Sequence, residues 1–546
     1  MDKEDFIELR SRAARDNGDD ENTKVSSSTT TVQAAHDKSD VSGSSGTSGS
    51  VADEAVHNQT RTRRLFSMSQ LFAFSLTYMG TWEGWNVNMT SALLNGGPRA
   101  LFFGAFLALA GAWAQAASVA EMASLQPVAG AQYHWTYHLA PKRVRRFMCY
   151  LQGWATWFGY VALLASIANS VVIQLEALIA FNHPSYVPGG WHTSVMVIAL
   201  CVGEGLLNMF AFKLVPWVEM TGGVLHVAMF IVFIILFPVM GTRHNSDILF
   251  LDSTASGWVD KPGVSWNLGM ITLTWALTGF DSAIHMSEET KAAKSAVPRA
   301  IFWSIFMNSL MGLVYISVFL IAMGPVDEVM GASMPLIHVI MRTVRSERAT
   351  TALYSLYWFN GIASNLASIA SVSRLTWAWS RDGGLPIYFS YIDPKLRVPA
   401  RALCLTVVLV SLLCLLNIGG TTFIVFGAIT GLTCWALYFS YAICLVSIIS
   451  ARFNGQEGGG GLKLGSWNLG RFGLVINCFA LVYTLYIMVW LPFPQSTPVD
   501  AAGMNYCAPM VGFVLIFTLG MWFGWARKNW PGPNVKIRDF VIAQTS

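Results

Sequence analysis

Residues 76–86 read Leu-Thr-Tyr-Met-Gly-Thr-Trp-Glu-Gly-Trp-Asn, and residues 275–282 read Trp-Ala-Leu-Thr-Gly-Phe-Asp-Ser. Each stretch lies inside an apolar run and combines glycine with a carboxylate, Glu83 in the first and Asp281 in the second. A carboxylate in hydrocarbon costs about 2.5–3.5 kcal/mol, so each acid requires a partner or a function. This pattern is typical of membrane helices that break near the bilayer midplane and expose backbone groups to ligands and ions.

The composition around these stretches indicates a polytopic membrane protein. Of 546 residues, 53% are hydrophobic and only 12% are charged, whereas soluble domains carry about 25% charged residues. The net charge of +4 is small and the basic residues are dispersed, which argues against nucleic-acid binding. Most of the eight cysteines lie in apolar runs, where cysteine behaves as a small hydrophobe rather than as part of a disulfide framework.

The motifs that an enzyme or a metalloprotein would need are not found in the sequence. His134 and His138 stand four residues apart, but they lie beside a loop without further ligands, so we expect structural roles for them. There is no glycine-rich phosphate-binding loop of the G-x-x-x-x-G-K-[ST] kind. We therefore expect neither an enzyme nor a bound cofactor or metal.

Apolar runs long enough to cross a bilayer follow one another from Leu65 onward, since a spanning helix needs about 20 apolar residues. We expect an all-α fold with about twelve transmembrane helices. The expected spans are 67–95, 98–121, 147–180, 193–212, 214–240, 265–286, 300–324, 350–378, 402–418, 422–449, 471–492 and 508–526. The division between the fourth and fifth spans rests on Lys213 and Pro216 and is the least secure.

The basic residues between the spans predict the orientation. If both termini are cytoplasmic, 23 of the 29 Lys and Arg residues from Arg61 onward lie inside. This bias follows the positive-inside rule and favours an even number of spans. We expect a multi-pass protein of the plasma membrane. Six basic residues lie outside: Arg99, Arg243, Lys261, Arg342, Arg345 and Arg348.

The chain divides into three parts. Residues 1–64 are rich in Ser, Thr, Asp and Gly and predict a disordered cytoplasmic tail, whose lysines could be sites for the ubiquitination machinery. No apolar h-region follows the N-terminus, so a cleavable signal peptide is not expected. Residues 65–530 form the transmembrane domain, and residues 531–546 form a cytoplasmic C-terminal tail.

The two glycine-acid stretches fall in spans one and six of twelve. This placement favours two five-helix inverted repeats, about 65–240 and 265–450, each beginning with its broken helix. Two extra helices follow, within about 471–526. The alternative interpretation is that each glycine forms a packing notch between close helices. The matching positions, each with an acid, favour a binding site.

Aromatic residues surround both acids, and a carboxylate among aromatic faces suits a cation. An ammonium group over a Trp face gains about 0.5–2 kcal/mol, although membrane proteins also place many Trp residues at their interfaces. The predicted substrate-binding residues are Tyr78, Gly80, Thr81, Trp82, Glu83, Gly84, Trp275, Thr278, Gly279, Phe280 and Asp281, with Glu83 and Asp281 as the coupling residues.

Four further acids receive structural interpretations. Glu121 and Glu176 lie near span ends, where water can solvate them. Glu204 and Glu219 lie in spans four and five, where they can face protein or form packing hydrogen bonds.

Three stretches resemble the amino acid–polyamine–organocation superfamily, and within it the fungal amino acid/choline transporter family with its choline and GABA permeases. The first is residues 118–124 (Ser-Val-Ala-Glu-Met-Ala-Ser) followed by 126–135 (Gln-Pro-Val-Ala-Gly-Ala-Gln-Tyr-His-Trp). The second is residues 279–283 (Gly-Phe-Asp-Ser-Ala) with Glu288, Glu289 and residues 298–301 (Pro-Arg-Ala-Ile). The third runs from Arg374 to residues 381–386 (Arg-Asp-Gly-Gly-Leu-Pro). The resemblance covers about residues 65–530.

The resemblance implies a five-plus-five inverted-repeat transporter with broken helices 1 and 6 and alternating access around them. It implies that Trp275 is a substrate-contacting gate and that Asp281, six residues later, is a coupling or conformational residue. Spans three and eight usually complete such a site. Their candidates here are Gln152, Trp157, Tyr160, Asn360 and Ser364.

One departure from the family bears on the substrate. Amino-acid members commonly have a Gly-Ser-Gly type turn in span one that receives the substrate carboxylate, whereas residues 80–84 here read Gly-Thr-Trp-Glu-Gly. An ionised Glu83 would repel a carboxylate. This favours a cationic substrate, or a Glu83 that cycles protons.

We therefore expect a secondary active, proton-coupled permease for a small amino-group or quaternary-ammonium compound such as choline, GABA or another amino acid. Sodium bound by backbone carbonyls of the broken helices is the alternative coupling ion. One alternative function is transport of an alkaloid-like specialised metabolite or its amino-acid precursor. Another is a nutrient sensor that does not transport.

Overall fold

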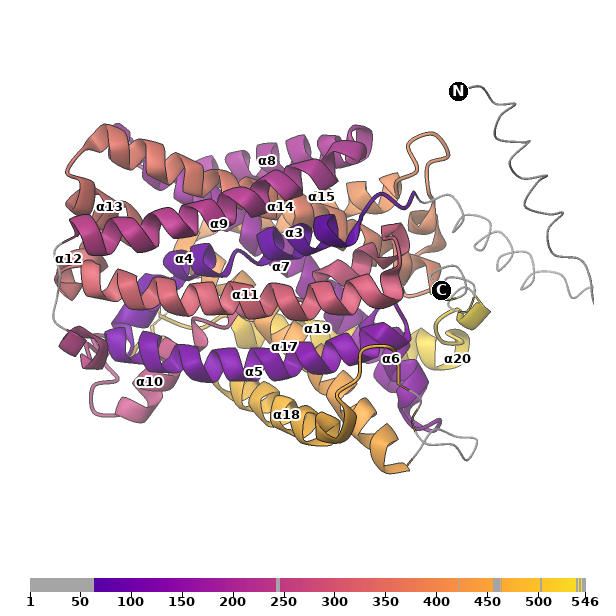
Figure 1. Ribbon diagram of the computed structural model, residues 1–546. Coiled ribbons are helices and arrows are strands. Elements are labelled where there is room, and N and C mark those ends of the chain that lie inside the picture. The colour runs from indigo at the N-terminus through magenta and orange to yellow at the C-terminus, as the bar shows by residue number, and fades with distance from the viewer. Residues whose placement is uncertain are drawn as a thin grey trace, which may run out of the picture. The chain divides into compact units, whose positions relative to one another are not determined.

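The computed structural model describes residues 63–241, 246–420, 422–454, 462, 464–500, 503–536, 539 and 542 (Figure 1). The expected N-terminal tail, apart from Arg63 and Arg64, lies outside the described residues, as does its proposed ubiquitination. The described chain is helical, and its β-type pairing is a single bridge between Phe66 and Thr290.

Nine helical segments of the described chain are long and apolar enough to cross a membrane. Several of them include a short continuing turn. They are α5 (Gly97–Leu125), α7 (Arg145–Asn182), α8 (Gly190–Phe210), η1 with α9 (Phe212–Leu214, Val215–Met240), α11 (Ala293–Ala322), α15 with α16 (Ala400–Cys414, Leu416–Gly419), α17 (Thr422–Asn454), η6 with α18 (Gly470–Phe472, Gly473–Trp490) and α19 with η7 and α20 (Cys507–Met521, Trp522–Ala526, Arg527–Asn529).

Three more segments bring this number to the twelve expected spans. The helix α14 (Glu347–Arg381) is long but carries many polar residues. The other two are interrupted, namely α3 (Met68–Met79) with α4 (Thr81–Leu94), and α10 (Pro262–Ile271) with η3 (Trp275–Leu277) and η4 (Ser282–Glu289). The all-α polytopic fold with broken helices 1 and 6 is therefore confirmed. The least secure boundary also holds, because η1 separates α8 from α9 at Lys213.

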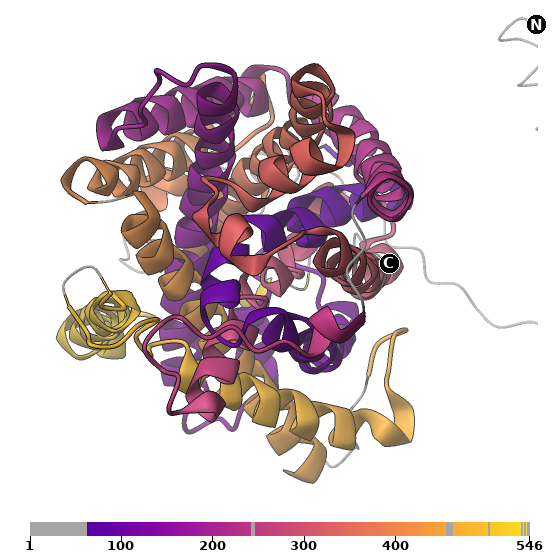
Figure 2. The ribbon, with the colours of Figure 1, turned by 90° about the vertical axis from the view of Figure 1, so that its left-hand side faces the viewer.

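Short elements connect the long helices. They are α6 (Gln132–Leu139), η2 (Ser246–Phe250), α12 (Val326–Gly331), α13 (Pro335–Val344) and η5 (Ile387–Ser390). The helix α7 is the most enclosed of the long helices and packs against α17 and α14. In the view along the helices, α18 and α19 lie at the edge of the bundle (Figure 2).

The break in the first span is narrower than the sequence pattern suggests. Only Gly80 leaves the helix, with a left-handed φ of +43°, whereas Gly84 is helical within α4. Gly84 instead allows a close approach, since a Cβ atom there would lie 2.8 Å from the Cβ of Ala276. The two broken spans therefore touch directly, which brings their polar residues together.

We expect Gly84→Ala to destabilise the protein by about 1–3 kcal/mol, because the added methyl group overpacks the contact with Ala276. The measurement is thermal unfolding in detergent. The matched control is Gly203→Ala on α8, where a Cβ atom meets nothing within 4 Å. A Gly84→Ala protein as stable as the control would contradict this close packing.

Candidate functional site

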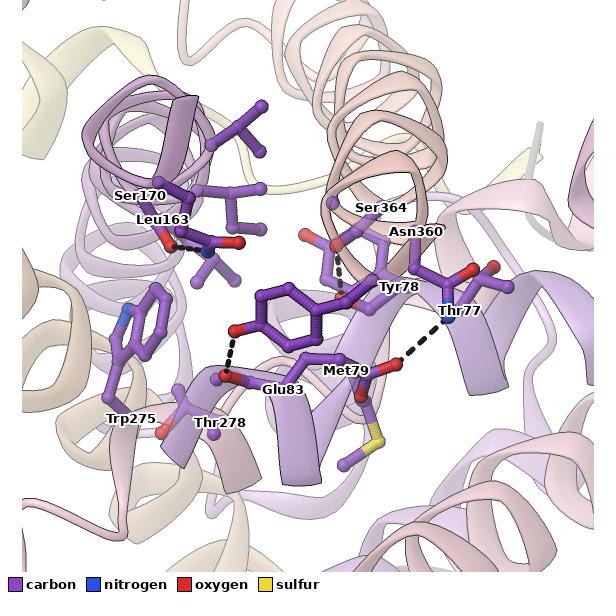
Figure 3. A pocket seen from close by; sticks show the side chains of 18 residues that line it. Thr77, Tyr78, Met79, Glu83, Leu163, Ser170, Trp275, Thr278, Asn360 and Ser364 are labelled. Atoms are coloured by element: carbon purple, nitrogen blue, oxygen red, sulfur yellow. Dashed lines mark hydrogen bonds between the residues drawn. The ribbon is translucent and has the colours of Figure 1, made fainter. Parts of the chain in front are cut away.

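A cavity of about 50 Å³ lies between the two breaks and the helices α7 and α14 (Figure 3). This volume suffices for a few water molecules and is smaller than the roughly 300–1,000 Å³ of ligand sites, so its walls stand close together. Glu83 is the one charged side chain in its lining. The lining residues are Thr77, Tyr78, Met79, Gly80, Glu83, Gly84, Leu163, Ile167, Ser170, Val171, Gln174, Trp275, Ala276, Thr278, Tyr357, Asn360, Gly361 and Ser364.

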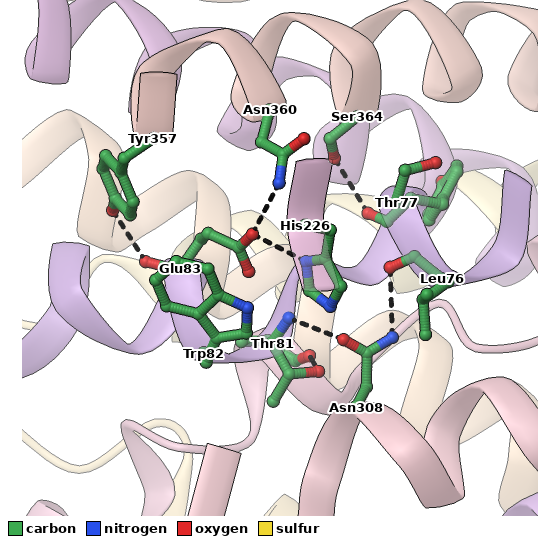
Figure 4. Close-up of polar contacts among 12 residues, drawn as sticks. Leu76, Thr77, Thr81, Trp82, Glu83, His226, Asn308, Tyr357, Asn360 and Ser364 are labelled. Atoms are coloured by element: carbon green, nitrogen blue, oxygen red, sulfur yellow. Dashed lines mark hydrogen bonds and ion pairs between the residues drawn. The ribbon is translucent and has the colours of Figure 1, made fainter. Parts of the chain in front are cut away.

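A single amide side chain bridges the break at Gly80. Asn308, on α11, accepts a hydrogen bond from the Thr81 N–H at 3.3 Å and donates one to the Leu76 carbonyl at 3.0 Å (Figure 4). The Thr81 hydroxyl donates to the Ala276 carbonyl at 2.9 Å, which ties α4 to the second broken span. A broken helix in hydrocarbon requires such partners, because water is not available to its backbone.

Glu83, in the first turn of α4, has two differently placed oxygens. Its Oε1 lies 2.6 Å from His226 Nδ1 and accepts a 2.9 Å hydrogen bond from Asn360 Nδ2 (Figure 4). Its Oε2 has no hydrogen-bond partner among the described residues. One oxygen is therefore fixed by α9 and α14, and the other remains free to accept a hydrogen bond from a ligand.

Aromatic rings stand around Glu83 in the cavity wall. Tyr78, Trp275 and Tyr357 line the cavity, and the Tyr357 hydroxyl donates to the Glu83 carbonyl at 3.0 Å. The Trp275 indole is held by a 3.0 Å hydrogen bond to Ser166 on α7. A carboxylate among aromatic faces provides an environment suited to an ammonium group.

The structure divides the predicted site residues into two groups. Those that line the cavity are Tyr78, Gly80, Glu83, Gly84, Trp275 and Thr278, and Asn360 and Ser364 from α14. Those outside its lining are Thr81, Trp82, Gly279, Phe280 and Asp281, and Gln152, Trp157 and Tyr160 from α7.

The predicted residues outside the lining have contacts of their own. Trp82 is buried behind Glu83, and its ring centroid lies 5.0 Å from that of Tyr315 and 5.9 Å from that of Tyr357. Phe280 packs against Tyr441 with ring centroids 5.2 Å apart. These rings therefore support the walls.

Asp281 belongs to a separate buried cluster below the second break. Its Oδ1 accepts a 2.5 Å hydrogen bond from the Tyr441 hydroxyl on α17, and its Oδ2 accepts one from Gln132 on α6. Asp281 therefore links the broken span to two other elements without contacting the cavity.

A larger cavity of about 560 Å³, called the vestibule below, lies at the end of the bundle formed by the last turns of α4 and the segment from the end of α10 to Trp275. The loops around Ser333 and Gln495 and the first half of α17 complete its walls. Trp275 lines both this vestibule and the small cavity. Trp275 is therefore part of the wall of both spaces.

The opposite end is closed by buried ion pairs. Arg374 pairs with Glu289 at 3.2 Å, and Arg381 pairs with Glu288 at 3.1 Å. Phe66 N–H donates to the Glu289 carbonyl at 3.1 Å, so the chain just before α3 joins the same closure. Because these pairs connect α14 to η4, this end cannot open without breaking them.

Asp382, just after α14, extends the closure to the C-terminal segment. Its carboxylate accepts hydrogen bonds from the Tyr133 hydroxyl at 2.7 Å and the Asn534 N–H at 2.9 Å, and it lies 2.9 Å from His134 Nε2. The buried Trp530 indole donates to the Asp382 carbonyl at 2.7 Å. Burial opposes ionisation, but the attraction of His134 and then Arg381, with these hydrogen bonds, lowers the pKa of Asp382 to about 2.

The four other acids expected in or near the spans each have a hydrogen-bond partner. Glu121 is buried and accepts hydrogen bonds from Arg452 and from the Leu469 N–H, so the expectation that water solvates it is wrong. Glu176 is also buried and accepts hydrogen bonds from Thr193 at 3.0 Å, so the same expectation is wrong there. The apolar runs around both acids hid these partners, which come from other segments.

Glu219 accepts a 2.5 Å hydrogen bond from Thr77, and Glu204 accepts a 2.7 Å one from Asn365. Both acids therefore form the packing hydrogen bonds expected of them. The functional partner that the sequence interpretation missed is His226. Its seven-residue spacing from Glu219 places the two on one face of α9 and was the available signal.

Comparisons with known proteins agree over most of the chain. A family model described as amino acid permease matches residues 66–516. The chain is 25% identical over 469 residues to the choline transporter of Saccharomyces cerevisiae, covering 84% of this chain and 81% of that protein. It is 29% identical over 506 residues to amino-acid permease 2 of Neurospora crassa, covering 90% of each. It is 28% identical over 485 residues to the transmembrane transporter swnT of Metarhizium robertsii, covering 86% and 93%.

We expect Asp382→Asn to lower the thermal stability in detergent at pH 7, because breaking a buried ionic network costs about 3–5 kcal/mol. The pKa of Asp382 falls from about 3.9 in an unfolded chain to about 2 in the structure. Its stabilising contribution is therefore complete above about pH 4 and is lost as the pH falls toward 2. The measurement is the melting temperature of both proteins from pH 8 to 2.5, which includes the range in which the contribution is lost.

The exposed Asp327 provides the matched control, Asp327→Asn, which should melt with the unmodified protein throughout. A difference between Asp382→Asn and the unmodified protein that vanishes between pH 7 and 5 would show that Asp382 does not hold a lowered pKa.

Proposed function

Since this chain belongs to the amino acid permease family, we propose that it is a proton-coupled permease for a small compound with a cationic nitrogen. Membership of this family makes it an integral multi-pass membrane transporter of amino acids or organic cations rather than an enzyme. Choline, GABA and other amino-group compounds are the candidate substrates. The orientation that we propose places both termini in the cytoplasm, at the plasma membrane, so the vestibule faces outward.

One observation carries this proposal: a single carboxylate, Glu83, faces a cavity otherwise lined by neutral side chains. Its unpartnered Oε2 is the acceptor for an ammonium group or the electrostatic partner of a quaternary nitrogen. Tyr78, Trp275 and Tyr357 supply the aromatic faces that favour such a cation. The similarity to a protein named choline transporter supports the same class of substrate.

The two ends of the bundle suggest how the site gains access to each side in turn. In the proposed cycle the substrate enters through the vestibule, and the Trp275 ring turns aside and then closes over it. The ion pairs Arg374–Glu289 and Arg381–Glu288 then break, because the substrate must leave through the end that they close. The proposed cycle therefore includes a state in which the route to the vestibule and the route to the ion-paired end are both narrow, and the present structure is consistent with that state.

Asp281 is the proposed proton site. It lies apart from the cavity, so its protonation does not compete directly with the substrate at Glu83. Protonation would weaken its hydrogen bonds with Tyr441 and Gln132, which join the second broken span to α17 and α6. The loss of these bonds would favour the rearrangement of η4 that opens the cytoplasmic end.

We expect labelled choline, GABA or putrescine to bind the purified protein in nanodiscs, and Glu83→Gln to lower the affinity for the bound cation by tenfold or more, on the scale of a lost charge-assisted contact of about 1.5–3 kcal/mol. The matched control is Glu219→Gln, a buried acid on α9 that does not line the cavity. Failure of all three compounds to bind would refute the cation site, as would unchanged affinity in Glu83→Gln.

We expect Asp281→Asn to abolish concentrative uptake into proteoliposomes driven by a pH gradient, while exchange of labelled for unlabelled substrate continues. The physical reason is that exchange requires no net proton movement. The readout is substrate-dependent acidification of a trapped pH indicator, with the experiment repeated in a sodium gradient at constant pH. Uptake driven by sodium, or proton movement that persists in Asp281→Asn, would remove Asp281 from the coupling role.

A further inference from the structure

His226 is a buried histidine that the proposed transport cycle does not use. It lies on α9, its side chain is fully buried, and its Nδ1 lies 2.6 Å from Glu83 Oε1. Its Nε2 has no hydrogen-bond partner among the described residues. Histidine changes charge between about pH 5 and 8. The one carboxylate that lines the cavity is therefore paired with a group that can gain or lose a positive charge.

The charge on His226 decides the net charge beside the cavity. Glu83 Oε1 accepts a hydrogen bond from Asn360 Nδ2 and lies 2.6 Å from His226 Nδ1, so a charge on the imidazole acts directly on this carboxyl group. With a neutral His226 the pair carries one negative charge, and a cation at Oε2 neutralises it. With a protonated His226 the pair is already neutral, and a cation at Oε2 adds an uncompensated positive charge. In a water-poor site such a charge is costly.

Other titratable groups around His226 do not supply this charge. The buried titratable side chains on the elements around it are Glu83 on α4, Tyr78 on α3, Tyr315 on α11, and Tyr354 and Tyr357 on α14. The buried Arg374 and Arg381 of α14 pair with Glu289 and Glu288. The phenols remain neutral over the pH range of the test. On α9 itself, Glu219 bonds Thr77. On α13, His338 and Arg342 pair with Glu328 of α12.

We propose that His226 binds a proton in competition with the cationic group of the substrate, so that each cation bound at Glu83 expels one proton. This inference rests on the proposed cation site. As the cation approaches Oε2, the imidazolium gives up its Nε2 proton to water. The imidazole is left neutral, its remaining Nδ1 proton is still shared with Glu83 Oε1, and the carboxylate is left paired with the cation.

The sign of the pH effect follows by linkage. A proton that is released on binding opposes binding when protons are abundant, so affinity for the cation falls as the pH falls. The limiting slope for one proton is about tenfold in Kd per pH unit. The affinity becomes independent of pH once His226 is neutral in the empty protein.

The experiment measures binding of labelled choline to the full-length protein in nanodiscs from pH 5 to 8.5. Calorimetry in buffers of different ionisation enthalpy then counts the protons released per choline. We expect the Kd to rise by about tenfold per pH unit on the acidic side. We also expect the count to move from about one proton there toward zero at pH 8.5. The same measurements on Asp281→Asn remove the proton site proposed for coupling. A pH-independent Kd in that protein, or a count near zero throughout, overturns the proposal.

His226→Asn tests the assignment to this residue. The Asn amide N–H can reproduce the Nδ1 donor to Glu83 but cannot titrate, so choline still binds at pH 8.5 while the pH dependence and the proton release disappear. A merely structural role would lower affinity equally at every pH. If His226→Asn does not fold, His226→Gln is tested in its place. Glu219→Gln, on the same face of α9, is the matched control and retains the pH dependence.

Two failures are distinguishable. If Glu83→Gln binds choline as well as the unmodified protein, or if choline, GABA and putrescine all fail to bind, the cation site is refuted and this inference falls with it. If Glu83→Gln loses choline binding but His226→Asn keeps the full pH dependence, the cation site stands and only the role of His226 is refuted.

Discussion

The amide of Asn308 satisfies the constraint on which the rest of the site depends. Breaking α3 from α4 at Gly80 leaves the Thr81 N–H without a helical partner, and hydrocarbon offers none. Asn308 accepts from this N–H and also donates to the Leu76 carbonyl on the other side of the break. With the break stabilised, the first turn of α4 can point Glu83 toward α9 and α14, and Gly84 can contact the second broken span. The position of the carboxylate is thus set by a side chain on α11.

The two acids that share a pattern in the sequence occupy different environments. Glu83 reaches the cavity with one free oxygen, whereas both oxygens of Asp281 are engaged by Tyr441 and Gln132. The same residue type can therefore meet a ligand in one span and hold elements together in the other. This difference is the structural basis for assigning the substrate to Glu83 and the proton to Asp281.

The fold could be predicted from local patterns, because apolar length, glycine and charge decide where a chain crosses a membrane. The two breaks followed from glycine next to an acid. The direction in which an individual side chain points could not be predicted in the same way. A break in a helix changes which residues of the following segment face the cavity. Trp82 and Phe280 were therefore expected at the cavity but lie behind its walls. His226 was missed because its partner is 143 residues away and only the packing of α9 against α4 brings them together.

The docking of Trp530 and Asn534 on Asp382 has a consequence for how the protein is made. Helices enter the membrane in chain order during synthesis, and the contacts of Glu288 and Glu289 with α14 can form once that helix has been inserted. The closure around Asp382 is complete only after the last described helix has left the ribosome and residues 530–534 have packed against the segment just after α14. The nascent chain therefore passes through a stage at which the end closed by the ion pairs lacks these last contacts, which only the C-terminal segment can supply.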